Sequence, residues 1–303
     1  MNDFSSRCPL CDLQTKLVYK LPKNSGNEFG IVGCPNCGLL RALPIPEIES
    51  IKALYTERPP QDLFEEAEVF SSPLLTKLKD SLIISPLIKW VRSELSRADK
   101  PKLLDIGCAT GWITAVARRF GFEAIGLEAN PYLADVAREK YGLEVKEGFL
   151  EDLEISQVFD AVCMFHVLEH LTNPLGVLRK IRSILKANGV LLAVVPNGGS
   201  LGVSIFKRYY NWSLPHHVSF FTPRSIQIAY EKAGFKVLSL RHLPSPPILW
   251  YSFHNLMKSR SYLQKLFGFL KNPYVNNAVF TPPAFVGKWV KKGEVIAVLG
   301  RKV

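Results

Sequence analysis

The sequence predicts an α/β protein in which a doubly wound sheet follows a small N-terminal module. Residues 102–106 form a short apolar segment that breaks into a glycine-rich turn and continues as a helix pattern over 112–120. From residue 99 onward, apolar strand patterns alternate with helix patterns, as in sheets that carry helices on both faces. The chain has 303 residues, 47% of them apolar, which suffices for one large α/β domain and a small one.

The small module is marked by two Cys-x-x-Cys pairs, formed by Cys8, Cys11, Cys34 and Cys37. Two residues between thiolates let both bind one metal ion, and Gly38 allows the second turn to close. With strands expected over 17–21 and 29–32, the pattern predicts a zinc ribbon within residues 1–45. Disulfides are one alternative, which a reducing cytoplasm disfavours, and a redox-active pair would not need the second pair. Four sulfur ligands leave no open coordination position, so the zinc would be structural.

Residues 46–98 are expected to form a linker and a helical cap. Several prolines occur near the start of this stretch, as is typical of linkers. Helix patterns follow over 48–55 and, with interruptions at two prolines, over 63–97. The cap would pack on the large domain, and a lid over a cofactor cleft is the alternative.

Residues 99–303 would form the large domain. Its expected strands span 102–106, 122–128, 143–146, 159–165, 190–195, 235–240 and 294–300. Its expected helices span 112–120, 132–141, 174–185 and 223–233. Residues 244–292 are expected to be an insertion before the last strand.

The strand–turn–helix unit at 102–120 has the chemistry of a nucleotide site. Gly107 and Gly111 let the backbone pass close to a ligand, at the free N–H groups of a helix N-terminus. Glu128 ends the second strand, where an acid can bind ribose hydroxyls. A nicotinamide-binding fold competes, but there the strand runs directly into Gly-x-Gly-x-x-Gly. Here Asp105 precedes the first glycine, which suits a ligand with a positively charged amino acid end.

This stretch resembles the first motif of class I S-adenosylmethionine (SAM) methyltransferases, an apolar strand followed by Asp-x-Gly-x-Gly-x-Gly. Asp105, Gly107 and Gly111 match the motif, and Ala109 stands at the middle glycine. The resemblance implies a seven-stranded sheet of order 3-2-1-4-5-7-6 with the last strand antiparallel.

Two later segments resemble the methyltransferase-23 subgroup, which includes ubiquinone-pathway O-methyltransferases. They are His-Val-Leu-Glu-His-Leu-Thr-Asn-Pro at 166–174 and His-Val-Ser-Phe-Phe-Thr-Pro at 217–223. The resemblance covers about residues 100–240, with its motifs in order.

SAM is the cofactor that the resemblance implies. Asp105 would orient the methionine amino group, and Glu128 would accept hydrogen bonds from both ribose hydroxyls. Phe149 and Leu150 would pack on the adenine, and Phe165 would lie under the methionine end. The expected cofactor-binding residues are Asp105, Gly107, Cys108, Ala109, Gly111, Trp112, Glu128, Asn130, Phe149, Leu150 and Phe165.

Histidines near the carboxyl ends of the expected strands are the candidate general bases: His217, His166 and His170. A histidine titrates near neutral pH and is the usual base for a hydroxyl or an acidic C–H. His217 is the first choice, because it resembles the histidine of a segment in deoxysugar C-methyltransferases, which also carry an N-terminal cysteine zinc module. Those enzymes usually have a tyrosine where this chain has Leu214. His170 could instead serve only as a hydrogen-bonding residue at the start of a helix.

The predicted function is SAM-dependent methylation of a small molecule or of a sugar or glycan precursor, at oxygen or carbon. RNA methylation is the alternative, since some ribosomal-RNA enzymes pair a zinc module with this fold. Residues 1–50 carry equal numbers of acidic and basic residues, which makes a nucleic-acid partner the weaker prediction. A zinc-ribbon adaptor with a degenerate domain is a third reading, and the intact glycine motif counts against it.

Positive charge is concentrated in the last third of the chain. Residues 200–303 hold 15 Lys and Arg but only two Glu, within a net charge of +11 for the whole chain. The insertion at 244–292 mixes basic and aromatic residues, so it could lie in an anionic membrane interface or close over the active site as a lid. No run of about 18 apolar residues and no secretory signal are present, which predicts a cytoplasmic protein with at most a peripheral membrane contact.

Overall fold

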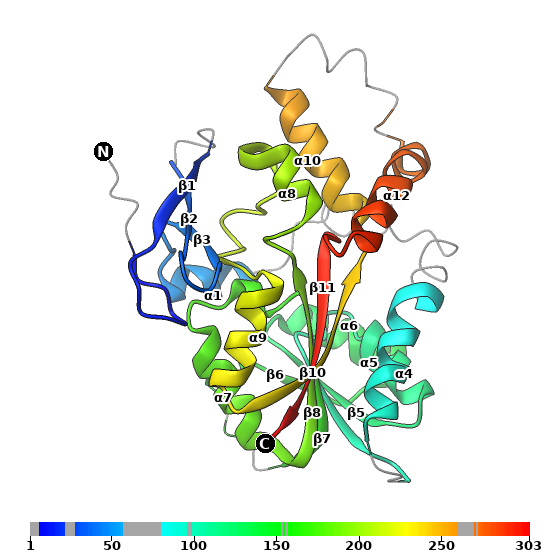
Figure 1. Ribbon diagram of the computed structural model, residues 1–303. Coiled ribbons are helices and arrows are strands. Elements are labelled where there is room, and N and C mark those ends of the chain that lie inside the picture. The colour runs from blue at the N-terminus through cyan, green and yellow to red at the C-terminus, as the bar shows by residue number, and fades with distance from the viewer. Residues whose placement is uncertain are drawn as a thin grey trace.

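Helices cover both faces of a large central sheet, and a small antiparallel sheet lies beside one helical layer (Figure 1). The computed structural model describes residues 6–21, 28–56, 80–95, 99–152, 154, 157–259, 270 and 272–303. None of the helices in these ranges is long and apolar enough to cross a membrane.

Seven strands form the central sheet, in the order β10-β11-β8-β7-β4-β5-β6. Their bounds are β4 (Lys102–Ile106), β5 (Glu123–Glu128), β6 (Val145–Glu147), β7 (Phe159–Phe165), β8 (Leu185–Pro196), β10 (Phe235–Leu243) and β11 (Val295–Lys302). β4 lies in the middle and pairs in parallel with β5 and β7, and β11 runs antiparallel to both of its neighbours. The predicted order 3-2-1-4-5-7-6, with an antiparallel last strand, is therefore confirmed.

The central strands are apolar on both faces because each face is covered. In β7, Val162 and Met164 belong to the core beneath α7 (Pro174–Ile184) and α9 (Pro223–Lys232). The alternate residue Cys163 belongs to the opposite core, beneath α4 and α5. These two helices span Ser85–Ser93 and Trp112–Arg119.

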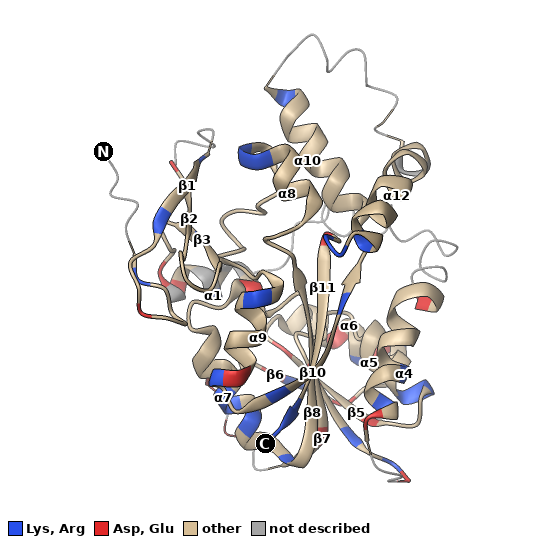
Figure 2. Ribbon diagram, viewed as in Figure 1, with Lys and Arg blue, Asp and Glu red and all other residues tan. Residues whose placement is uncertain are grey.

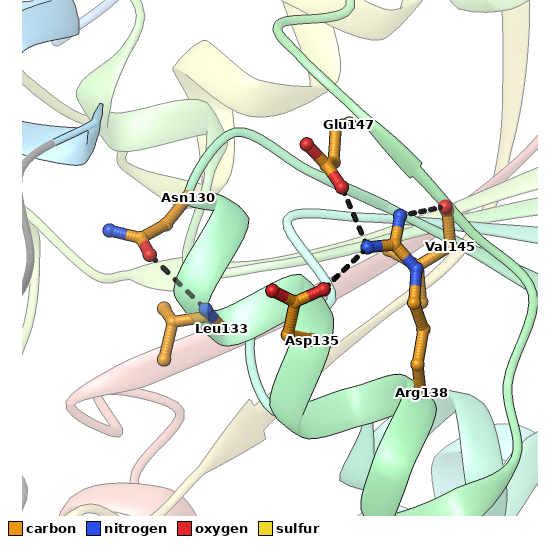
Figure 3. A network of polar contacts seen from close by, with 6 residues as sticks. All are labelled: Asn130, Leu133, Asp135, Arg138, Val145 and Glu147. Carbon is orange, nitrogen blue, oxygen red and sulfur yellow. Dashed lines mark hydrogen bonds and ion pairs between the residues drawn. The ribbon is translucent and has the colours of Figure 1, made fainter.

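Helix α6 (Pro131–Tyr141) is fixed at both ends and along one side. The Asn130 side chain caps its start by accepting from the Leu133 N–H at 3.1 Å, and Gly142 ends it in the left-handed conformation. Arg138 joins the helix to β6, because its guanidinium donates to Glu147 at 2.6 Å and to the Val145 carbonyl at 2.7 Å (Figure 3). This network holds α6 and β6 as one edge of the sheet.

The N-terminal sheet has four strands, of which sequence analysis anticipated two. β1 (Lys16–Lys20), β2 (Gly30–Gly33) and β3 (Leu40–Leu43) form an antiparallel meander. The fourth strand, β9 (Ser219–Phe220), comes from the large domain and pairs antiparallel with β3. The sheet thus joins residues on both sides of the predicted boundary near residue 45.

The described part of the predicted cap contains α1 (Ile48–Thr56), the π-helical turn η1 (Asp80–Ile84) and α4. α1 follows the N-terminal sheet, and η1 leads into α4. Buried residues of α4, among them Leu87 and Val91, pack on the central sheet as expected for a covering helix. The part of the expected helix over 63–79 lies outside the described residues.

The inserted region forms a helical layer above the sheet edge. It contains α10 (Pro246–Lys258) and α12 (Pro273–Trp289). Earlier in the chain are the short turn η2 (Leu168–His170), the helix α8 (Leu201–Phe206) and the short turn η3 (Lys207–Tyr209). Trp250 of α10 and Phe280 of α12 pack with ring centroids 5.8 Å apart. Together with Leu249, Leu270 and Ala284 they form a separate apolar core between the two helices.

Candidate active site

A cavity of about 380 Å³ lies at the carboxyl ends of β4, β5 and β7, the edge at which α/β sheets bind ligands. Its walls are largely apolar, with a few charged and polar side chains. The lining residues are Lys52, Tyr55, Ile106, Gly107, Ala109, Leu127, Glu128, Ala129, Leu133, Gly148, Phe149, Leu150, Glu151, Phe165, His166, Val167, His170, Leu171, Thr172 and Val177.

The glycine turn reaches this cavity through Gly107 and Ala109. Gly107 has φ +69°, and a Cβ there would lie 2.5 Å from Val167 Cγ2, so no larger residue fits. Gly111 instead allows two helices to pack closely. It has φ +81°, and a Cβ on it would lie 2.7 Å from Ala137 Cβ. The first glycine therefore shapes the cavity, and the last lets α5 approach α6.

Glu128 is held rigidly at the cavity wall. It is buried, and its two carboxylate oxygens accept from the backbone N–H groups of Ala109 at 2.8 Å and Asn130 at 2.9 Å. Burial raises the pKa of Glu128, and these N–H groups oppose that rise. Each oxygen keeps a second lone pair, so the carboxylate can still accept from two hydroxyl groups.

Asp105 lies beneath the cavity and does not line it. It is 1% exposed and accepts from the Thr114 hydroxyl at 2.7 Å. Burial raises the pKa of Asp105 to about 7, and the nearby charge of Glu128 also raises it. A cationic group bound above the turn would favour the ionised carboxylate.

The predicted cofactor residues thus divide into two groups. Those that line the cavity are Gly107, Ala109, Glu128, Phe149, Leu150 and Phe165. Those that do not line it are Asp105, Cys108, Gly111, Trp112 and Asn130. Members of the second group have structural contacts: Cys108 packs with Ala137 and Val145, Trp112 packs on the core beneath α5, and Asn130 caps α6.

His166 combines three features of a functional residue. It lines the cavity, its backbone has φ +56°, and its Nδ1 lies 3.1 Å from Glu169 Oε1. A non-glycine residue in this conformation is strained and is found preferentially at functional sites. Because the Glu169 carboxylate can only accept, Nδ1 of the neutral ring carries the proton and Nε2 keeps the lone pair.

Glu169 is fully buried behind His166. Burial by itself would raise the pKa of Glu169, but its hydrogen bond to His166 and the positive charge of the neighbouring histidines hold that pKa below the ordinary value. The carboxylate is therefore ionised at neutral pH and can accept a hydrogen bond from His166 Nδ1. In the sequence, Glu169 stands within the motif at 166–174, which predicts no role for it.

His170 also lines the cavity, and its Nδ1 lies 3.0 Å from the His216 carbonyl and 2.7 Å from the Tyr55 hydroxyl. The carbonyl can only accept, so the Nδ1 of a neutral His170 is protonated.

His217 lies behind this ring, with ring centroids 4.7 Å apart, and does not line the cavity. Burial lowers the pKa of His217 to about 3, which makes it a weak base. Ligand atoms of Glu169, His170 and His217 lie within 4.8 Å of one another and could hold a cation.

Two cavity residues, Lys52 and Tyr55, come from α1 and were missed. Lys52 Nζ lies 5.2 Å from the Phe149 ring centroid and 2.5 Å from Asp152 Oδ2. Lys52 and Tyr55 follow Ile48 at four and seven residues along α1, which is the spacing of one side of a helix. A lysine and a tyrosine at that spacing were the available signal.

The four N-terminal cysteines converge on one point, with their sulfur atoms within 4.8 Å of one another. Cys8 Sγ and Cys37 Sγ lie 3.6 Å apart, and this contact lowers the pKa of Cys8 to about 5. Backbone N–H groups of Leu10 and Cys11 also stabilise the Cys8 thiolate. A cluster of four close sulfurs with backbone donors fits a tetrahedral Zn²⁺, which Cys8, Cys11, Cys34 and Cys37 would hold.

We expect the protein, purified under reducing conditions, to contain one Zn²⁺ per chain. Cys34→Ser should lower the zinc content sharply, because a hydroxyl is a poor replacement for a thiolate. Cys108→Ala, which removes a thiol far from the cluster, is the matched control and should keep the metal. Chelation should unfold the N-terminal sheet and leave most of the helical circular dichroism signal. Absence of zinc by elemental analysis, or disulfides under these conditions, would contradict the site.

A seven-stranded sheet with this order, and a cavity at the carboxyl ends of its central strands, defines a methyltransferase fold. A family model described as a methyltransferase domain matches residues 83–240, more than half of the chain. The chain therefore belongs to this family, methyltransferase-23.

Curated relatives are similar over about half of the chain. The ubiquinone biosynthesis O-methyltransferase of Ruegeria sp. (strain TM1040) is 27% identical over 162 residues, covering 49% of this chain and 66% of the relative. The protein of the same name from Cereibacter sphaeroides (strain ATCC 17025 / ATH 2.4.3) is 29% identical over 167 residues, with the same coverage. The matched part thus spans just under two thirds of these relatives.

The fold is also found among solved structures. Magnesium protoporphyrin IX methyltransferase from Synechocystis PCC 6803, with bound SAH, aligns with a TM-score of 0.55 at 9% identity. The alignment covers 85% of this chain and all of that one. At this identity the similarity establishes the fold alone.

Proposed function

We propose that this protein transfers a methyl group from SAM to a small-molecule acceptor, at an oxygen or a carbon atom. The single observation that supports this most is the cavity that joins a fixed acid, Glu128, to a histidine–carboxylate pair, His166 and Glu169. The relatives' names, which specify O-methylation in ubiquinone biosynthesis, favour a small acceptor. A sugar or glycan precursor remains a prediction within this class.

SAM, when bound, supplies an electrophilic methyl group on a sulfonium. Glu128 would accept from the ribose hydroxyls, and the apolar side chains of Phe149 and Leu150 would pack on the adenine. Asp105, beneath the turn, would become ionised near the methionine amino group. The mostly apolar walls would exclude water from the reacting atoms.

His166 is the proposed general base, in place of the predicted first choice, His217. Its free Nε2 would take the proton that the acceptor hydroxyl or C–H loses as the new bond to the methyl carbon forms. Glu169 would stabilise the resulting imidazolium and hold the ring in its tautomer. His170, with Nδ1 bound to His216 and Tyr55, is the second candidate in the same cavity.

Two measurements test the proposal. Titration calorimetry should detect binding of SAM and of S-adenosylhomocysteine to the folded chain, and no heat with either ligand would refute it. Transfer of tritiated methyl from SAM into a fractionated extract should then label a small-molecule or solvent-extractable fraction. Label confined to RNA would support the alternative prediction, RNA methylation, and exclude the small-molecule acceptor.

A further inference from the structure

The outer face of α12 is a continuous stripe of exposed apolar side chains. Val279, Val286, Trp289 and Val290 are 47%, 45%, 75% and 55% exposed. With the exposed Ala278, Pro282 and Pro283 they recur at the three- and four-residue spacing of one helix face. We call these seven residues the α12 outer stripe: Ala278, Val279, Pro282, Pro283, Val286, Trp289 and Val290.

This stripe is a second apolar face, because the inner face of α12 already has its own core. Phe280 and Ala284 of the inner face pack against Leu249 and Trp250 of α10. A surface helix ordinarily presents polar residues on the side away from its core. An apolar face that large on the outside marks an interaction surface.

Part of the apolar side of α10 is turned inward. Its residues Leu249, Trp250 and Met257 are buried inside the protein. None of the described residues within 244–292 lines the cavity, so the lid alternative receives no support from the cavity walls. Among the described residues of 244–292, the large exposed apolar side chains therefore lie on α12 and at its C-terminal end.

Positive charge stands at the C-terminal end of the stripe. Lys288, Lys291 and Lys292 are exposed, and none of them forms an ion pair with a carboxylate of the described part of the chain. No Asp or Glu occurs between Glu231 and Glu294, and Glu294 is buried against Ser200 and Gly202. Figure 2 shows blue but no red along α10 and α12.

We propose that the α12 outer stripe docks on an anionic lipid surface. The valines and prolines would enter the boundary between headgroups and acyl chains, Trp289 would lie at the interface, and the lysines would face lipid phosphates. Charge favours this occupant over a second copy, since lipid phosphates would face all three lysines, whereas two stripes packed in parallel would bring their lysine clusters together.

The location of α12 connects this surface to the active site. β11 begins at Val295, directly after α12, and Val295 pairs with Pro196 at the carboxyl end of β8. α12 therefore lies at the carboxyl-terminal end of β8 (Figure 1), and the cavity lies at the carboxyl ends of the neighbouring strands. Provided that the proposed methyl transfer holds, docking would bring the cavity close to acceptors dissolved in or attached to the membrane.

Co-sedimentation of the full chain with vesicles tests the docking. We expect binding to vesicles of phosphatidylcholine and phosphatidylglycerol at 7:3, weaker binding at high salt, and little binding to phosphatidylcholine alone. The Val279→Glu/Val286→Glu double variant should bind at least tenfold more weakly. Replacing Lys288, Lys291 and Lys292 by Gln should lower the affinity roughly 100-fold, since each lysine near anionic lipid contributes about 1 kcal/mol.

Ile205→Glu is the matched control, because Ile205 on α8 is also an exposed apolar residue, at 61%. It should bind vesicles like the unmodified chain. Failure of the folded chain to bind anionic vesicles at low salt would overturn the proposal. So would a dimer in sedimentation equilibrium that Val286→Glu dissociates, because the stripe would then be a contact between copies. Vesicle binding requires no methyl transfer. A failure of the docking proposal can therefore be distinguished from a failure of the proposed methyltransferase function.

Discussion

Replacing Glu128 by Ala should weaken SAM binding by a factor of roughly 10²–10⁴. Two charge-assisted hydrogen bonds to the ribose hydroxyls would be lost, each contributing about 1.5–3 kcal/mol. The effect is expected to be large because Glu128 is fixed before the ligand arrives, by the N–H groups of Ala109 and Asn130. Titration calorimetry with SAM and S-adenosylhomocysteine gives the affinity.

Glu147→Ala is the matched control for Glu128→Ala. Glu147 is the register partner of Glu128 on the neighbouring strand β6, but it binds Arg138 and does not line the cavity. Glu147→Ala should leave the SAM affinity within a few-fold of that of the unmodified chain. Thermal unfolding without ligand shows whether either variant has lost its fold. If both variants bind SAM alike, Glu128 is not the ribose ligand.

Substituting His166 should lower methyl transfer by about 10²–10⁴-fold while SAM affinity stays nearly unchanged. His166→Asn is the suitable variant, because asparagine tolerates the φ of +56° that the backbone has there. Incorporation of tritiated methyl into the labelled fraction of extract gives the rate. Glu169→Gln should also slow the reaction and shift its pH profile, because the imidazolium would lose its carboxylate partner.

His216→Asn is the control for this series, since the exposed ring of His216 does not line the cavity. It should retain most of the activity. His217→Ala distinguishes the general base proposed from the structure, His166, from the one predicted from sequence, His217. Full activity in His166→Asn together with a severe loss in His217→Ala would restore His217 as the base and contradict the role of His166.

Sequence was a good guide wherever the information is local. The strands of the central sheet follow from a regular alternation of strand and helix patterns, and the turn at Gly107 follows from residues that are adjacent in the chain. The order of the strands was expected from the resemblance to methyltransferases. The cysteine cluster could also be predicted from sequence, because the spacing within each Cys-x-x-Cys pair is set by the ligand geometry of one metal ion.

Contacts between distant segments could not be predicted in the same way. β9 has two residues, which is too short for a periodic signal, and its partner β3 lies in another module. Lys52 and Tyr55 reach the cavity from α1, which precedes the glycine turn by about 50 residues. The burial that lowers the pKa of His217 depends on packing around it. Such features depend on tertiary structure and have no local pattern.

The pairing of β3 with β9 has a consequence for the order in which the chain folds during synthesis. Arg41 and Ser219 are register partners separated by nearly 180 residues. At roughly 5–20 residues per second, the ribosome needs on the order of ten to forty seconds to make β9 after β3 has emerged. During that interval the first three strands have an open edge along β3, which nascent chains or chaperones can meet. Early metal capture by the cysteines would hold this partial sheet together until its last strand arrives.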